Sequence, residues 1–307
     1  MTNVSAQMVK TLREKTGAGM MDCKKALGET SGNIEEAVDW LRKKGLSAAA
    51  KKADRVAAEG LVAFAVKERA GALIEVNAET DFVSRNVAFQ DFASSLASLV
   101  LEHGDDIDAL KNIAYPGTGR NVEEQLTHNI ATIGENMAIR RAVRVEGADL
   151  VVPYMHNSIA GSLGKIGVLI SIKSDAEVSE LEMLGKQLAM HVAATAPQAL
   201  SVAELDPISV AREKNVLTEQ AKASGRPEEI IEKMVDGRLK KFYQEVVLLE
   251  QTFVIDNETK ISAVIEKKAN ELGKQVELTG FHRISLGEGI EKNEADFASE
   301  VAATLGS

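Results

Sequence analysis

The first 55 residues show the hydrophobic spacing of short amphipathic helices. An apolar stripe at helical intervals is made by Val4, Met8, Val9 and Leu12. Gly17 follows this stripe as a residue suited to a helix C-cap, and a second helix is predicted over 20–30. Asn33 followed by Glu36 resembles a capping box and opens a third helix, which Gly45 is expected to close. The pattern therefore predicts a compact three-helix domain, joined to the rest by a helical linker over 47–58.

From residue 60 the apolar period changes from that of helices to that of strands. Alternation over 61–66 and 73–76 predicts a β-hairpin with its turn at 69–72. A helix follows, with its buried face predicted at Phe89, Phe92, Leu96 and Leu99.

Further along, 104–121 reads as irregular and 122–139 as helix, and 141–145 with 150–155 reads as another strand pair. A strand over 166–173 and a helix over 181–194 then repeat the earlier order of strand, acidic turn and apolar helix. This repetition indicates two related α+β halves, although any two strand–turn–helix units would look alike.

A helical hairpin is predicted inside the second half. Asp206 followed by Pro207 is a strong helix start, and the break at 224–227 separates two helices of similar length. Short connections of this kind make antiparallel neighbours. The α+β pattern resumes afterwards with strands over 252–255 and 276–286, a helix over 261–272 and a terminal helix over 291–305, so the second half is discontinuous. The fold class is therefore α+β.

Composition excludes several classes of protein. The chain of 307 residues has no apolar run long enough to cross a membrane and no secretory signal at its N-terminus. Cys23 is the only cysteine, which favours a reducing compartment and a cytoplasmic location. A net charge of −10 and 4% aromatic residues argue against direct nucleic-acid binding. Within this acidic chain, residues 1–55 carry more basic than acidic side chains. This excess fits modules that meet different surfaces, and it fits an ordinary solvated helical face equally well.

No catalytic constellation emerges from the sequence. The segment Gly161–Lys165 lacks the spacing of a phosphate-binding loop, and Gly287 with Gly289 lacks the third glycine of a dinucleotide turn. The five histidines do not recur at metal-ligand spacing. We therefore expect no enzyme activity, no cofactor and no metal site.

Several unusual strings resemble the elongation factor Ts family. The string TGAGMMDCKKAL at 16–27 is similar to its N-terminal signature, and EVNAETDFV at 75–83 to its second. Four further strings match in order, namely Ile133–Asn136 with Arg140-Arg141, His191–Ala194, Glu232–Val235 and Gly287–Lys292. Six ordered matches over nearly the whole chain make the resemblance specific.

The resemblance implies a modular architecture. It has an N-terminal three-helix domain of ubiquitin-associated type, a core of two related α+β subdomains, an inserted antiparallel hairpin and a C-terminal helical module. The boundaries expected here are 1–55 for the first domain with its linker, 56–149 for core subdomain N, 150–205 and 246–285 for core subdomain C, 206–245 for the hairpin and 286–307 for the C-terminal module. The hairpin serves dimerisation in some members, so a homodimer is an expectation only.

The resemblance also implies a function, the exchange of guanine nucleotide on elongation factor Tu. Asp81 and Phe82 match residues that wedge near the switch region of that GTPase and disturb its Mg²⁺ site. The other residues expected at the partner interface are Thr80, Val83, Lys24, Ile133, Gly134 and His156. At His156 the chain departs from the pattern, because the loop that follows is longer and Lys165 replaces an arginine.

Two alternatives stay open. Phe82 lies seven residues before Phe89, so on one continuous helix it would belong to the core, whereas a break at 84–86 would leave it exposed at a tip. For the whole chain, the alternative to an exchange factor is a non-catalytic adaptor whose basic three-helix head binds protein or RNA.

Overall fold

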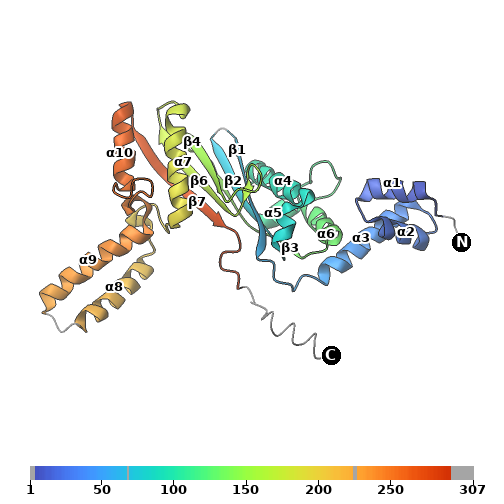
Figure 1. Ribbon diagram of the computed structural model, residues 1–307, viewed down its shortest axis with the longest axis horizontal. Coiled ribbons are helices and arrows are strands. Elements are labelled where there is room, and N and C mark those ends of the chain that lie inside the picture. Colours follow the sequence, from blue (N-terminus) through green and yellow to red (C-terminus); the bar gives the residue numbers. More distant parts are fainter. Residues whose placement is uncertain (1–3, 68, 224–226, 292–307) are drawn as a thin grey trace.

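The computed structural model describes residues 4–67, 69–223 and 227–291 of the chain. Helices and antiparallel sheets occupy separate layers, which confirms the α+β class. The molecule is elongated: a helical domain lies at the N-terminal end, two sheets form the middle, and a pair of helices projects from the other end (Figure 1).

Three helices make up the N-terminal domain, as predicted. They are α1 (Ala6–Thr16), α2 (Met20–Glu29) and α3 (Ile34–Ala50), and α1 ends at Gly17 with a left-handed φ of 67°. Their shared core consists of Leu12, Cys23, Ala26, Leu27 and Ala37.

Two details of this domain differ from the sequence prediction. Gly45 does not end the third helix, which continues to Ala50. A Cβ on Gly45 would lie 3.5 Å from the Ala131 Cβ, so α3 packs closely on a helix of the core there, and that packing outweighs the low helix propensity of glycine. The Asn33 side chain caps α3 by accepting from Glu35 N and Glu36 N. In a capping box the Glu36 carboxylate would accept from the Asn33 backbone N–H, but here it accepts from the Asn33 side-chain Nδ2.

The first sheet follows the N-terminal domain. Its antiparallel strands have the order β3-β2-β1-β5, with β1 at Glu59–Lys67, β2 at Ala70–Ala78, β3 at Met137–Val145 and β5 at Leu163–Gly164. Helix α4 (Val87–His103) covers its outer face and buries Phe89, Phe92 and Leu96 as predicted. Helices α5 (Ile107–Lys111) and α6 (Val122–Ile133) lie beside it.

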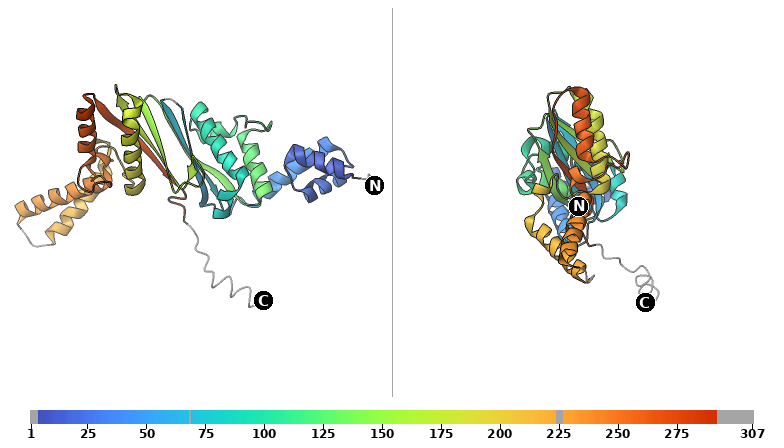
Figure 2. Two further views of the ribbon diagram at one scale, coloured as in Figure 1. Left: turned by 45° about the horizontal axis from the view of Figure 1, so that its top comes forward. Right: turned by 90° about the vertical axis from the view of Figure 1, so that its left-hand side faces the viewer.

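The second sheet has the strand order β4-β6-β7. Its strands are β4 (Leu150–His156), β6 (Ile166–Ser174) and β7 (Val276–Ser285), all antiparallel. Helices α7 (Val178–Thr195) and α10 (Ile261–Leu272) cover its outer face. Figure 2 shows the resulting layers side by side.

The inner faces of the two sheets pack against each other. A core cluster containing Val62 and Leu73 from the first sheet and Val151 and Leu169 from the second fills the space between them. A Cβ on Gly167 would lie 2.7 Å from Leu73 Cδ2, so glycine permits this close approach. The two α+β halves therefore share one interior.

Several predicted elements need correction. The strand pair at 141–145 and 150–155 is wrong, because β3 pairs with β2 and β4 pairs with β6. The short connection between β3 and β4 instead carries the chain from one sheet to the other. The helix predicted over 122–139 stops at Ile133, where Gly134 adopts a left-handed φ of 95°.

Three smaller differences remain. The region 104–121 contains α5, and 252–255 is not a strand but holds an isolated bridge from Thr252 to Lys260. The terminal helix predicted at 291–305 lies, except for its first residue, outside the described residues.

The predicted hairpin consists of α8 (Pro207–Lys222) and α9 (Glu228–Val246). Asp206 caps α8 by accepting from Ile208 N and Ser209 N. The two helices pack through Leu217, Ala221 and Val235, and the pair projects from the second half of the core (Figure 1). The domain boundaries drawn from the sequence stay predictions.

Candidate functional site

The candidate site is a short turn between β2 and α4. A 3-10 helix spans Asp81–Arg85, and Asn86 then caps α4 by accepting from Ala88 N and Phe89 N. Of the two alternatives left open by the sequence, the structure shows the break at 84–86, and Phe82 is 76% exposed. Burying an aromatic side chain that is this exposed would release free energy.

The base of the turn is anchored in the core. Val83 and Ser84 are buried, Ser84 Oγ donates to Asp81 O at 2.6 Å, and Gln90 Nε2 donates to Ser84 O at 2.8 Å. Asp81 is exposed beside Phe82. The turn thus presents one carboxylate and one aromatic ring together.

Thr80, at the start of the turn, is held by a carboxylate from a different part of the chain. Thr80 N donates to Glu135 Oε2 at 2.9 Å and Thr80 Oγ1 donates to Glu135 Oε1 at 2.7 Å. Thr80 occupies the N-cap position, but its hydroxyl makes no capping bond to the turn.

The neighbouring residues form a second clasp. Asn136 N donates to Glu79 Oε1 at 2.5 Å, and Asn136 Nδ2 donates to Arg55 O at 2.7 Å. The segment that leads into β1, the end of β2 and the start of β3 therefore meet at the base of the turn.

A buried charge cluster lies further along β2. The Glu75 side chain is fully buried and accepts from Arg140 Nη1 at 3.0 Å, Arg141 Nε at 2.6 Å and Gly287 N at 2.8 Å. The register between β2 and β3 shifts after Glu75, which leaves Arg140 without a strand partner of its own. Such a β-bulge lets two successive side chains, which would otherwise alternate, turn to the same carboxylate.

This cluster keeps Glu75 ionised. Burial by itself would raise the pKa of Glu75, but the hydrogen bonds from Gly287, Arg141 and Asn77 outweigh it and lower the pKa below its ordinary value. Arg141 also contacts Glu288, whose carboxylate accepts from Arg283 Nη1 at 3.1 Å on β7. The cluster therefore ties the first sheet to the end of the second.

Ile133 and Gly134 lie next to the turn. They immediately precede Glu135, and Ile133 packs partly against the core of the first sheet while Gly134 is exposed. The bonds between Glu135 and Thr80 thus place both residues near the start of the turn.

His156 lies at the same end of the sheets as the turn. It ends β4 opposite Ile166 in β6, and the adjacent Lys165 pairs with Glu59, which starts β1 opposite Ala78. The His156 side chain is exposed, and its Nδ1 lies 3.1 Å from Tyr154 Oη.

Lys24 is separate from these residues. It is exposed on α2, in the N-terminal helical domain at the end of the molecule (Figure 1). His191, which begins one of the matching strings, is fully buried, with Nε2 2.9 Å from Gln251 Oε1 and Nδ1 accepting from Val254 N.

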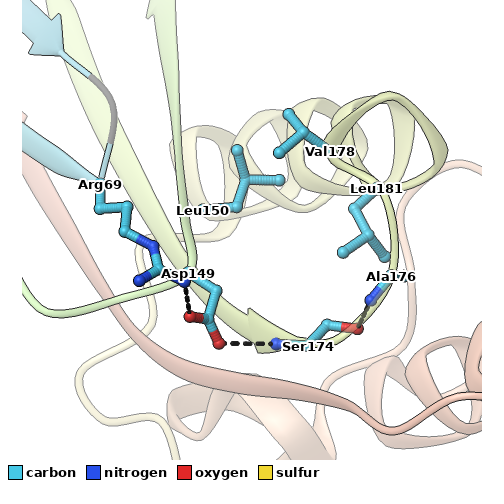
Figure 3. Close-up of a pocket in the computed structure, with 7 residues that line it drawn as sticks. All are labelled: Arg69, Asp149, Leu150, Ser174, Ala176, Val178 and Leu181. Atoms are coloured by element: carbon cyan, nitrogen blue, oxygen red, sulfur yellow. Dashed lines mark hydrogen bonds and ion pairs between the residues drawn. The ribbon is translucent and has the colours of Figure 1, made fainter.

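A cavity of about 400 Å³ lies at the opposite end of the core. Apolar side chains of Leu150, Val178 and Leu181 line it (Figure 3), and its polar groups are already bonded to one another. Asp149 pairs with Arg69 and accepts from Ser174 N. None of the predicted site residues lines this cavity.

Two features are absent from the described part of the chain. Within residues 4–67, 69–223 and 227–291, no three potential metal ligands cluster. No helix in those ranges is both long enough and apolar enough to cross a membrane.

Sequence reasoning missed the residues that support the turn. Glu135, Glu75 and the two arginines lie inside the quoted strings, but their pairing spans 55 or more residues and leaves no local signal.

Fold and site together define an elongated, modular α+β protein whose candidate site is an exposed turn rather than a cleft. A family model described as elongation factor TS matches residues 79–288. Curated relatives named elongation factor Ts include those of Rhodospirillum centenum, 59% identical over 100% of both chains, and Rhodospirillum rubrum, 60% identical over 99% of both. That of Paramagnetospirillum magneticum is 59% identical over 100% of this chain and 98% of its own. The chain belongs to the elongation factor Ts family, a family of translation elongation factors.

Proposed function

We propose that this protein is a guanine-nucleotide exchange factor that acts on elongation factor Tu in the cytoplasm. The observation that carries the proposal is the Phe82 side chain, 76% exposed on a turn whose flanking residues are anchored in the core. Membership of the family adds the identity of the partner.

The proposed mechanism needs no nucleotide site on this chain. Phe82 and Asp81 insert beside the switch region of the GTPase and displace the elements that hold Mg²⁺. Because Mg²⁺ requires near-ideal octahedral geometry, a small displacement weakens its hold on GDP. Linkage makes the effect reciprocal, so GDP weakens the binding of the factor by the same ratio. The protein acts in this account as an exchange factor and not as an enzyme with an active site or cofactor.

The remaining predicted residues are proposed to bind the partner or to support the residues that do. Val83 lies buried within the turn, Thr80 precedes it, Ile133 and Gly134 lie beside it, and His156 lies at the same end of the sheets. Lys24 would make a separate contact from the N-terminal domain. A homodimer through the α8–α9 hairpin is a further part of the proposal, tested by measuring the mass of the free protein in solution.

The exchange proposal is tested with elongation factor Tu preloaded with fluorescent GDP. A catalytic amount of this protein, added with excess unlabelled nucleotide, is expected to accelerate the loss of fluorescence. An unchanged release rate would reject the exchange function and leave the adaptor alternative.

The role of the exposed pair is tested by the double variant Asp81→Ala/Phe82→Ala. Losing the burial of one phenylalanine in the displaced state is expected to slow maximal release between about ten- and a hundredfold. Binding of the two proteins should weaken much less. The control is Met183→Ala, which removes an apolar side chain that is 66% exposed on α7. Equal losses in release and binding would indicate simple anchoring instead.

A further inference from the structure

Thr80 and Glu135 continue the pairing of two strands after the strands themselves have ended. The last paired residues of β2 and β3 are Ala78 and Met137. One step further Glu79 faces Asn136, and two steps further Thr80 faces Glu135. At both steps a carboxylate oxygen replaces the backbone carbonyl as acceptor of the opposite N–H.

Glu135 itself has little freedom to move. Gly134 before it occupies a left-handed conformation that ends α6, and Asn136 after it is bound through its backbone N–H to Glu79 and through its amide to Arg55 O. The backbone on both sides of Glu135 is therefore fixed, and this holds its carboxylate at Thr80.

The turn needs such support because it is short. A 3-10 helix of five residues has poor hydrogen-bond geometry and is weak by itself. The bonds from Thr80 fix the backbone at the residue before Asp81, while Gln90 and Ser84 fix the other side. Both bonds to Glu135 are charge-assisted, which makes them the strongest of these restraints.

We propose that Glu135 is the positioning residue of this turn, holding Asp81 and Phe82 in the conformation that meets the partner. It acts through Thr80 and need not touch the GTPase. The inference rests on the proposed exchange function for its consequence. A preformed tip avoids the cost of ordering the turn during nucleotide displacement.

The test compares Glu135→Gln with the wild type in two measurements. A carboxamide has no charge and only one acceptor oxygen, so the Thr80 hydroxyl must turn and accept from the new NH₂ group, and both bonds lose their charge assistance. In the free protein, backbone amide exchange over 80–83 is expected to accelerate about tenfold, the size expected when two charge-assisted hydrogen bonds become neutral ones. Amides in the middle of β1 and β2 should not change.

In the exchange assay, Glu135→Gln is expected to lower the maximal rate of GDP release about five- to tenfold while KM changes less than about twofold. The variant would still bind the GTPase through its other contacts, so KM changes little. Only those complexes in which the turn is ordered would release GDP, so the maximal rate falls. Glu123→Gln is the matched control, because it removes the same charge from an exposed position on α6. Adding Thr80→Val to Glu135→Gln should cost less than the sum of the two single effects.

The outcomes separate the two proposals. If the wild type does not accelerate GDP release, the exchange function fails, and the amide measurement alone decides whether Glu135 holds the turn. Slower release with unchanged amide exchange would mean that Glu135 contacts the partner directly and would overturn the positioning role. Faster amide exchange with unchanged release would overturn it equally.

Discussion

Glu75 illustrates how a single residue can depend on distant parts of the chain. Its buried carboxylate accepts from two arginines of β3 and from the backbone of Gly287. A buried charge is tolerable only when its partners are complete, because removal of one leaves the others unpaired in a medium of low dielectric constant. The cluster therefore makes the two strands and the chain after β7 mutually dependent.

Replacing Glu75 by glutamine is expected to lower the free energy of unfolding by about 3–5 kcal/mol at pH 7. Urea unfolding measures this, and Glu277→Gln, at an exposed position on β7, should change stability by less than about 0.5 kcal/mol.

The difference between wild type and Glu75→Gln should depend on pH. The pKa of Glu75 is lower in the folded state than its ordinary value of 4.5, so its contribution is fully present above that value. It is lost as the pH falls through the folded pKa. The stability difference should therefore shrink in acid, and a constant difference would contradict the assigned ionisation.

At the scale of elements, two glycines inside helices have opposite roles. Gly185 in α7 faces β4, where an added Cβ would lie 2.4 Å from Val152 Cγ2. Gly237 in α9 has no atom within 4 Å of such a Cβ. The first glycine permits close packing of helix on sheet, whereas the second only weakens its helix.

Alanine at each position gives a paired prediction. Gly185→Ala should destabilise the protein by about 1–3 kcal/mol, because the added methyl group overpacks the contact with Val152. Gly237→Ala should stabilise α9 by about 0.5–1 kcal/mol through its higher helix propensity. Thermal unfolding of both variants measures this, and effects of the same sign would contradict the packing described for α7.

Most elements were predictable from local pattern, but their partners were not. The N-terminal helices and the β1–β2 hairpin followed from caps and periodicity, because these signals lie within a few residues of one another. Periodicity alone left Phe82 undecided between the core and an exposed tip, since its spacing to Phe89 fits one continuous helix. Two helix ends were predicted wrongly. Helix α3 continues beyond Gly45 because it packs on α6 there, and α6 ends at Ile133 because Gly134 is left-handed, although apolar residues follow. The assignment of β3 and β4 to different sheets, like the contact of Thr80 with Glu135, depends on the tertiary fold.

At the scale of the whole molecule, the N-terminal domain is docked against α6. Arg42 pairs with Glu124, Lys52 Nζ donates to Ile130 O at 3.4 Å, and His128 lies against Gly17, where an added Cβ would be 3.2 Å from Nε2. Burial, helped by the nearby Arg120, lowers the pKa of His128 from 6.5 to about 4.

This docking is expected to weaken as the pH falls from 7 toward 4. Between these pH values His128 binds a proton when the domain is undocked but stays neutral when it is docked, because its pKa is lower in the docked state. Acid therefore favours the undocked state. Backbone amide exchange in α3 and α6, corrected for intrinsic rates, should rise more in the wild type than in His128→Gln. His103→Gln, at an exposed position on α4, should behave like the wild type, and equal pH responses of all three would exclude His128.

The bond between Glu75 and Gly287 also has a consequence for synthesis on the ribosome. The two residues are 212 positions apart, and translation delivers Glu75 long before its backbone donor. The first sheet must also wait for β5 at its edge. The N-terminal helical domain can fold as soon as it emerges, but the core can close only when translation is nearly finished. In a nascent chain stalled before residue 287, the N-terminal helical domain should therefore be folded while the core is incomplete and the Glu75 carboxylate is still exposed to water.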